Sequence, residues 1–234
     1  MIPASERSDR LITETLEFLR QTFSVRAVMF YWIEPELDTV NDALLGLPEG
    51  LAEHYRREMR PYDPLLASRL VEGGKSIAEL HSEAKAIPAQ DRRRYLSFLG
   101  EYNVTGNLEF VFWSGEGQER RAFGGASLLG LEGDPPFTGD FRMIDAIYRY
   151  VAFNLQSHER VRTEKRGRML RERVGLTARE CAVCEYVSVG ASNQDIADCL
   201  GLTLSTVKTY MRQIFDKVGV DTRTALAARL SSFT

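Results

Sequence analysis

Hydrophobic positions recur at helical spacing at both ends of the chain, and strand-like runs lie between them. Apolar residues three or four positions apart in residues 5–23 predict an amphipathic helix. Residues 25–33 are rich in β-branched and aromatic side chains and predict a strand. We expect a second strand over residues 39–45. Residues 107–113 and 119–131 predict two more, joined in a hairpin by a glycine-containing turn.

Helices are expected on both sides of this hairpin. Residues 51–60, 63–71, 88–102 and 137–163 carry helical patterns, and the charged stretch 165–174 has the composition of a linker. We therefore expect an α+β domain in residues 1–164, in two or three layers around an antiparallel sheet, then the linker, and an all-α domain in residues 175–234.

Three helices in the last domain begin at residues that can cap them: Thr177 with Glu180, Ser192 with Asp195, and Thr203. Gly190 and Gly201 lie where the first two helices must end. The spacing is that of a helix-turn-helix, whose second helix enters the major groove of DNA.

The third of these helices, residues 203–218, has an apolar stripe and an opposite polar face. Lys and Arg on the polar face can reach guanine or phosphate, and residues near helix starts can bind phosphates together with local amides. The candidate DNA-binding residues are Lys208, Thr209, Arg212, Ser205, Thr206, Ser192 and Asn193. The alternative is a small helical bundle with a solvated polar face.

Residues 176–223 resemble the DNA-binding domain of the LuxR family of bacterial transcription regulators. The shared residues are Leu176, Thr177, Arg179, Glu180, Gly190, Ser192, Asn193, Ile196, Ala197, Thr206, Val207, Lys208, Ile214, Lys217, Gly219, Val220 and Arg223. Cys184, Thr203 and Tyr210 depart from the family pattern. The resemblance implies that Lys208, Thr209 and Arg212 face the bases and that a fourth helix, residues 222–231, mediates dimerisation.

The order of elements in the first domain is similar to that of the sensing domain of quorum-sensing LuxR proteins. That resemblance implies an α-β-α sandwich that binds acyl-homoserine lactones between sheet and helices. Tyr55 and Asp63 match its sensing motif, but Leu51 replaces a tryptophan that donates to the lactone carbonyl. An unpaired buried acceptor costs on the order of 1–3 kcal/mol. We therefore expect a pocket that does not favour a common acyl-homoserine lactone and reads an N–H group or a cation.

The remaining candidates for ligand binding are four aromatic residues and one serine: Trp32, Phe110, Phe112, Trp113 and Ser127. Alternate residues of one strand point to opposite faces, so the aromatic residues cannot all face inward. The alternative for Tyr55 and the aromatic residues is a place in the core, and for Asp63 a role as a helix cap before Pro64.

The charge is distributed unevenly along the chain. Residues 160–234 hold 13 Lys or Arg against 8 Asp or Glu, a charge of +5, whereas the rest carries −8. This asymmetry favours nucleic-acid binding by the last domain alone. The start of the chain has no signal-like segment and no long apolar run follows, so a cytoplasmic protein without membrane contact is expected.

Cys181 and Cys184 form a C-x-x-C pair, but a structural zinc site needs four ligands and the three histidines lie in the first domain. We expect the cysteines, Cys199 included, to be small buried apolar residues and expect no metal or cofactor. Nucleophile elbows, HExxH motifs and phosphate loops are missing from the sequence, which argues against an enzyme.

These observations predict a homodimeric transcription regulator that binds a roughly palindromic DNA site and responds to a small-molecule signal. RNA polymerase is a further candidate partner. The alternative is a ligand-independent regulator whose first domain serves dimerisation or protein contacts only.

Overall fold

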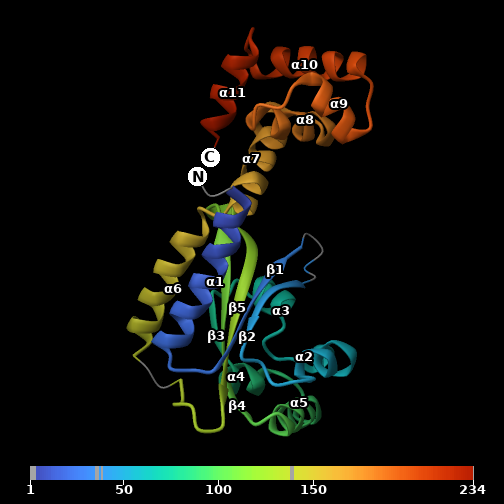
Figure 1. The fold of residues 1–234 in the computed structure, drawn as a ribbon. Helices are drawn as coiled ribbons and strands as arrows, with labels where there is room; N and C mark the ends of the chain where they lie inside the picture. The colour runs from blue at the N-terminus through green and yellow to red at the C-terminus, as the bar shows by residue number, and fades with distance from the viewer. Residues whose placement is uncertain (1–3, 35–36, 38, 138–139, 234) are drawn as a thin grey trace. The chain divides into compact units, whose positions relative to one another are not determined.

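The computed structural model describes residues 4–34, 37, 39–137 and 140–233. The chain divides into two compact units, Met1–His158 and Glu159–Thr234 (Figure 1). The first is an α+β unit and the second is all α-helical. The expected fold class is therefore confirmed.

A five-stranded antiparallel sheet forms the centre of the first unit, in the order β2-β1-β5-β4-β3. The strands are β1 (Ala27–Ile33), β2 (Thr39–Leu45), β3 (Ile77–Glu79), β4 (Val104–Ser114) and β5 (Arg121–Leu131). The long hairpin β4–β5 pairs Glu109 with Ser127, and β1 pairs Met29 with the same Ser127. Tyr31, two residues after Met29, points to the same face as Glu109 and Ser127, so polar side chains from three neighbouring strands share one face of the sheet.

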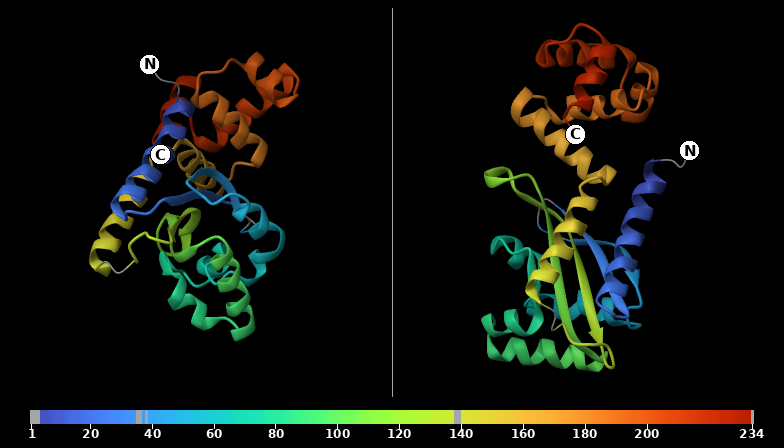
Figure 2. Two further views of the ribbon diagram at one scale, coloured as in Figure 1. Left: turned by 60° about the horizontal axis from the view of Figure 1, so that its bottom comes forward. Right: turned by 90° about the vertical axis from the view of Figure 1, so that its left-hand side faces the viewer.

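Helices cover both faces of this sheet (Figure 2). On one face lie α1 (Ala4–Thr22) and α6 (Phe141–Leu155), which contact each other and the central strands. The other face is covered by α2 (Leu51–His54), a π-helical turn η1 (Tyr55–Met59), a 3₁₀ turn η2 (Arg60–Tyr62), α3 (Ala67–Glu72), α4 (Leu80–Glu83), η3 (Ala84–Ala86) and α5 (Ala89–Glu101). The α-β-α arrangement follows from the two apolar faces of the sheet, each of which must be buried.

The second unit contains α7 (Glu159–Val174), α8 (Ala178–Ser188), α9 (Asn193–Leu200), α10 (Leu204–Val218) and α11 (Arg223–Ser231). Val207, Met211 and Ile214 on α10 are buried in its core, as their spacing predicts. Leu226 and Leu230 of α11 complete that core.

The stretch 165–174, expected as a linker, is helical and belongs to α7. Its Glu, Lys and Arg residues are good helix formers, which the linker interpretation overlooked. Leu170 packs into the core of the second unit, and the Gly167 carbonyl accepts a contact from the Cys181 thiol at 3.8 Å. The division between the two units falls at His158 rather than at residue 164.

The single helix expected over residues 137–163 is interrupted. Between α6 and α7, Ser157 donates from its hydroxyl to the Asn154 carbonyl at 2.7 Å, and the His158 amide bonds to the Leu155 carbonyl. A serine hydroxyl that competes for helix carbonyls weakens the helical path. The apolar spacing of residues 137–163 gives no sign of this break.

Cys181 and Cys184 are buried, as expected, but Cys199 is exposed. Burial raises the pKa of the Cys184 thiol to about 12, so this thiol stays protonated. Among the described residues, no group of three or more His, Cys, Asp or Glu side chains is placed to hold a metal ion. Within the same residues, no helix combines the length and apolar character needed to cross a membrane.

Candidate functional site

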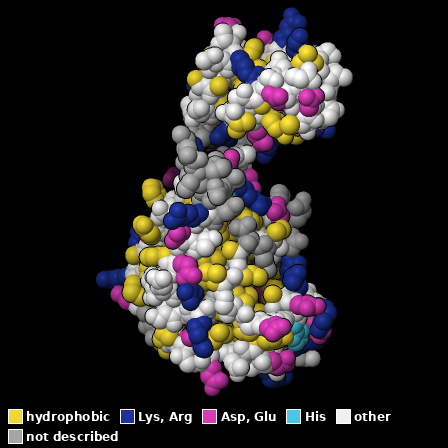
Figure 3. Space-filling model, in the orientation of Figure 1, with side chains coloured by type: hydrophobic (Ala, Val, Ile, Leu, Met, Phe, Trp, Pro, Cys, Tyr) yellow, Lys and Arg dark blue, Asp and Glu magenta, His cyan; other side chains and the backbone are white. Residues whose placement is uncertain are grey.

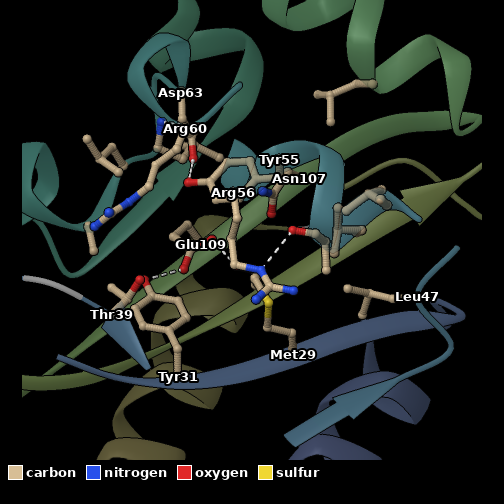
Figure 4. A pocket seen from close by; sticks show the side chains of 18 of the residues that line it. Met29, Tyr31, Thr39, Leu47, Tyr55, Arg56, Arg60, Asp63, Asn107 and Glu109 are labelled. Atoms are coloured by element: carbon tan, nitrogen blue, oxygen red, sulfur yellow. Dashed lines mark hydrogen bonds between the residues drawn. The ribbon is translucent and has the colours of Figure 1, made fainter. Parts of the chain in front are cut away.

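A cavity of about 540 Å³ lies between the sheet and the α2–α5 side of the first unit (Figure 4). Its volume is in the range typical of small-molecule pockets. Most of its wall is apolar, from Met29, Leu47, Leu51, Leu65, Leu66, Phe98, Leu99 and Leu129. The polar groups come from Tyr31, Thr39, Tyr55, Arg56, Arg60, Asp63, Tyr95, Asn107, Glu109 and Ser127.

Glu109 is the buried acid on the sheet side of this pocket. Its side chain is 2% exposed and accepts two hydrogen bonds of 2.6 Å, from the Tyr31 phenol and the Ser127 hydroxyl. Burial raises the pKa of Glu109 to about 8, with the neighbouring charge of Asp63 adding to the rise and the two hydrogen bonds opposing it. Asp63 adds to the rise because a second negative charge nearby disfavours ionisation of Glu109.

Asp63 is the second buried acid and comes from the opposite wall. It follows η2 and accepts from the Tyr55 phenol at 2.8 Å and from the Leu65 amide at 2.8 Å. Burial raises the pKa of Asp63, although hydrogen bonds from Tyr55, Leu65 and Tyr95 oppose the rise. Its bond to the Leu65 amide fixes the turn before α3. The alternative that Asp63 caps a helix beginning at Pro64 is wrong, because α3 begins only at Ala67 and its N-cap, Leu66, makes no side-chain cap.

The phenols that surround these acids remain neutral. Burial, with the charge of the adjacent carboxylates, raises the pKa of Tyr31, Tyr55 and Tyr95 above the ordinary tyrosine value. Each phenol can therefore donate a hydrogen bond throughout the physiological pH range. All three residues line the same pocket as the two acids.

Asn107 adds a third acceptor to the pocket. It lies two residues before Glu109 on β4, so both side chains point to the same face of the sheet. Its Oδ1 atom is buried and has no hydrogen-bond partner within the described part of the chain. A buried acceptor left unpaired is costly, and a bound ligand with a donor would satisfy it.

Gly125 makes room for the phenol of Tyr31. The two residues are paired across β1 and β5, and a Cβ added at position 125 would lie 2.3 Å from the Tyr31 oxygen. Only a residue without a side chain lets the tyrosine ring cross this strand to reach Glu109. The Gly124–Gly125 pair, which is unremarkable in the sequence, thus positions a pocket residue.

The pocket includes Tyr55, Asp63, Leu51 and Ser127 as expected, but it does not include the four aromatic candidates. Trp32, Phe110 and Phe112 point to the opposite face of the sheet: Trp32 contacts His158, and Phe110 and Phe112 contact Tyr148 of α6. The expectation that these residues line the pocket is wrong. Side chains alternate along a strand, and the pocket lies on the face that carries Tyr31 and Glu109.

Trp113 is also excluded from the pocket. A register shift between Phe112 and Trp113 changes the alternation at the end of β4. Its Nε1 donates to the Lys75 carbonyl at 3.2 Å, and the Arg120 guanidinium lies 3.9 Å from its ring centre. This tryptophan therefore stabilises the end of the hairpin.

Four residues that were not predicted from the sequence form the polar centre of the pocket together with Asp63: Tyr31, Tyr95, Asn107 and Glu109. One signal was present: Glu109 is the only charged residue of β4 and lies between the apolar residues Leu108 and Phe110. A charged residue buried in a central strand needs partners and marks a functional site more often than a surface acid does. Arg56 and Arg60, on η1 and η2, also line the cavity, and π-helical turns are frequent at functional sites.

The second unit presents the polar face of α10. Thr203 caps this helix by accepting from the Thr206 amide at 3.2 Å, and Gly219 ends it with a φ of 73°. Lys208, Thr209 and Arg212 are exposed on the face opposite the buried stripe. The two preceding helices have the expected capping boxes, Thr177 with Glu180 and Ser192 with Asp195.

Several of the other candidate residues also hold the fold in place. The hydroxyls of Ser205 and Thr206 each lie 2.8 Å from that of Thr203, and Thr209 donates to the Ser205 carbonyl at 3.1 Å. Asn193 accepts from the Arg223 guanidinium at 3.1 Å, which ties α11 to the start of α9. Ser192 accepts from the Asp195 amide at 3.2 Å, so its hydroxyl is a helix cap as well as a phosphate candidate.

Glu180 links α8 to the end of α10. Its side chain is 2% exposed, accepts from the Thr177 amide at 2.6 Å and forms an ion pair of 2.7 Å with Lys217. Burial acts to raise the pKa of Glu180, but Lys217 and Thr177 outweigh it, so the net pKa is lowered. This pair holds the C-terminal end of α10 against the capping box of α8.

Residues 174–230 match the family described as bacterial regulatory proteins, luxR family. Over 230 residues, 96% of this chain and 92% of the relative, the chain is 29% identical to a "Monoamine regulon transcriptional regulator" of Klebsiella aerogenes. This similarity extends through both units, whereas the family match covers the second unit only from the last residue of α7 to α11.

Solved structures show a weaker likeness. SdiA of Escherichia coli is 14% identical, with all of this chain and 92% of that chain covered and a TM-score of 0.45. The VqsR LBD domain of Pseudomonas aeruginosa is also 14% identical, over 68% of this chain and 93% of that one, with a TM-score of 0.47. Likenesses of this size say nothing about what the pocket holds.

Proposed function

From a chain whose second unit carries a helix-turn-helix domain of the luxR family, we propose a transcription regulator that reads duplex DNA with α10 and is controlled by a small molecule bound in the first unit. The observation that carries the DNA-reading part is the exposed basic and polar face of α10, opposite its buried stripe, in a domain where α8, α9 and α10 are each capped by a side chain. Net positive charge in residues 160–234 supports contact with phosphates.

On DNA, Lys208, Thr209 and Arg212 contact base edges in the major groove. Arg and Lys can donate to guanine O6 and N7, and the threonine methyl can contact a thymine methyl. Ser205, Thr206, Ser192 and Asn193 lie at the starts of α9 and α10, where amides and hydroxyls position the protein on phosphates. The exposed side chains of α10 thus provide sequence specificity, and the helix starts position the protein on the DNA backbone.

The regulator acts as a homodimer in the bacterial cytoplasm and binds a roughly palindromic site. Exposed apolar side chains on one side of α6 support the dimer: Met143 is 48% exposed, Tyr150 61% and Phe153 78%. Hydrophobic side chains lie along this part of the first unit (Figure 3). Monomeric soluble proteins seldom expose such a group of large apolar side chains together. RNA polymerase is the further partner proposed for activation of a promoter.

The pocket supports control by a small molecule over the ligand-independent alternative. A domain used for dimerisation alone would fill its centre with apolar side chains, whereas this one keeps two buried acids and an unpaired carbonyl around an open cavity. Since the Klebsiella relative is named for a monoamine regulon, monoamines are the first ligands to test.

The proposal is tested by selecting binding sites from random duplex DNA with the purified full-length chain. We expect enrichment of a two-fold symmetric sequence, bound by a dimer in analytical ultracentrifugation. Enrichment of no sequence, or equal affinity for selected and scrambled duplexes, would overturn the DNA-reading part. Matched selections with and without a cell extract separate ligand-dependent from ligand-independent binding.

A further inference from the structure

The polar centre of the pocket consists mainly of acceptors, and this arrangement limits what it can hold. Glu109 and Asp63 enter from opposite walls, and Asn107 Oδ1 lies beside Glu109 on the same strand face. The hydrogen bonds that these acids receive come from neutral groups, the phenols of Tyr31 and Tyr55, the Ser127 hydroxyl and the Leu65 amide. Two buried acids close together gain most from a positive charge placed between them.

A neutral amide ligand would leave this centre incompletely satisfied. Its single N–H group can pair with the Asn107 oxygen, which has no partner among the described residues, but it brings no positive charge to offset the two buried acids. A primary ammonium group has three donors and a positive charge, and the centre offers three acceptors that differ in direction. Tyr31, Tyr55 and Tyr95 also line the pocket, and aromatic rings attract cations.

We propose that the pocket binds an organic monoamine with an apolar body, whose ammonium group is held by Glu109, Asp63 and the Asn107 side-chain oxygen. This inference rests on the proposed function, because it names the ligand class of the same pocket. The apolar wall from Met29, Leu51 and Leu129 receives the rest of the ligand.

The two arginines narrow the class further. Arg56 and Arg60 line the cavity from η1 and η2, and Arg56 is fixed by a bond from its Nε to the Ala52 carbonyl at 3.1 Å. A ligand with a second cationic group would meet these guanidinium groups with a like charge. The pocket therefore selects a monocation over a polyamine.

Binding of a cation is coupled to the ionisation of Glu109. The pKa of Glu109 is raised to about 8, mainly by burial, so this acid is largely protonated in the empty pocket at neutral pH. The ammonium group favours the carboxylate, so binding releases a proton and the affinity rises with pH until about 8. The ionisable groups that also face the cavity are Tyr31 on β1, Tyr55, Arg56 and Arg60 on η1 and η2, Asp63 after η2, and Tyr95 on α5. The phenols remain neutral because their pKa values are raised by burial.

The test is isothermal titration of the full chain with 2-phenylethylamine and hexylamine, compared with 2-phenylethanol, hexanol and N-(2-phenylethyl)acetamide. We expect each amine to bind at least tenfold more tightly than its neutral counterparts at pH 8, and to weaken by up to about tenfold per pH unit below that. Spermidine should bind more weakly than either monoamine.

Glu109→Gln keeps the size of the side chain and should weaken amine binding at least tenfold and remove its pH dependence. Asn107→Leu removes the third acceptor and should weaken it by a smaller factor. Glu116→Gln, in the exposed turn of the same hairpin, is the control and should bind as the wild type does. Because neutral glutamine resembles protonated Glu109, Glu109→Gln should unfold near the wild-type temperature at pH 6, which shows that the variant is folded.

The inference is overturned if an alcohol or the acetamide binds as tightly as its amine, if Glu109→Gln binds amines as the wild type does, or if neither amine binds at pH 8. These failures leave the DNA-reading proposal intact as long as the same preparation still binds its selected duplex. Loss of specific DNA binding in that preparation would instead count against the proposed function.

Discussion

Tyr31 and Glu109 lie 78 residues apart in the sequence and form a buried hydrogen bond of 2.6 Å. The bond joins β1 to β4 across the intervening strand β5, which contributes Ser127 to the same carboxyl group and Gly125 to the space that the phenol occupies. Three strands therefore cooperate to hold one acid in the pocket.

The first prediction concerns the pH dependence of stability. Burial raises the pKa of Glu109 in the fold to about 8, from its ordinary value of 4.5. Between these pH values the folded state therefore binds more protons than the unfolded state. The contribution of Glu109 to stability is therefore fully present below about pH 4.5 and is lost as the pH rises through 8. Glu109→Gln has no ionisable group at this position, so at pH 8.5 its free energy of unfolding should exceed that of the wild type by an amount on the order of a few kcal/mol. Urea unfolding of the ligand-free chain at pH 6 and 8.5 measures it; parallel pH profiles for both proteins would contradict the prediction.

The second prediction concerns Gly125. A methyl group at this position would overlap the Tyr31 phenol, so Gly125→Ala should move the ring and break its bond to Glu109. Overpacking of this kind costs about 1–3 kcal/mol. Thermal unfolding should show a clear decrease in melting temperature, and Tyr31→Ala in the Gly125→Ala background should recover part of it. Gly100→Ala is the control, because this exposed glycine of α5 has open space around the missing side chain and no positive φ, so the substitution should not lower the melting temperature.

The architecture was largely predictable because it depends on patterns that repeat. The β-branched and aromatic content of residues 25–33 predicts a strand, and β1 occupies Ala27–Ile33. The strand expected over residues 39–45 has the same bounds as β2. The caps Thr177, Ser192 and Thr203 were identifiable because the capping chemistry is local to a few residues.

The pocket was less predictable because it depends on register. Tyr55, Asp63, Leu51 and Ser127 came from a motif, whereas Glu109 meets Tyr31 only after the order of three strands is known. Likewise Trp32 and Tyr31 are adjacent in the sequence, and only the sheet shows which of them faces the cavity. Side-chain direction in a strand changes with a shift of one residue, which composition does not reveal.

The third prediction concerns the link between α8 and α10. Lys217→Met leaves the buried carboxylate of Glu180 without its cation and should lower the free energy of unfolding of the second unit by about 1–3 kcal/mol. The loss is no larger than this because Lys217 is partly exposed and solvent screens the pair. The pKa of Glu180 is lowered in the fold, so this stabilisation is present above about pH 4.5 and decreases as the pH falls through the folded pKa. Urea unfolding at pH 7 measures the change. Lys208→Met, on the exposed face of the same helix, is the control; an equal effect of both substitutions would refute a specific role of the pair.

The fourth prediction concerns DNA reading. Lys208→Ala and Arg212→Ala should each weaken binding to the selected duplex by about 1–3 kcal/mol and relax the base preference at one position of each half-site. Arg93→Ala, an exposed arginine of α5 in the first unit, controls for the loss of one positive charge. Fluorescence anisotropy against the selected and scrambled duplexes provides the comparison. If both α10 variants keep the wild-type affinity and footprint, these residues do not read bases.

The fifth prediction concerns self-association. Phe153→Lys places a charge in the exposed apolar surface of α6 and should shift the chain from dimer toward monomer without a large change in melting temperature, because Phe153 makes little contact within its own unit. Sedimentation equilibrium measures the shift. Arg149→Lys on the same helix serves as the control, and a Phe153→Lys protein that remains fully dimeric would show that the dimer uses another surface.

The most direct measurement is the affinity of the full chain for its selected duplex, by fluorescence anisotropy at pH 8, with and without saturating 2-phenylethylamine. For a regulator controlled through this pocket, the amine should change the DNA dissociation constant of the wild type at least threefold, and Glu109→Gln should bind DNA with no response to the amine. An unchanged dissociation constant at an amine concentration that titration shows to fill the pocket would contradict control of DNA binding by this site.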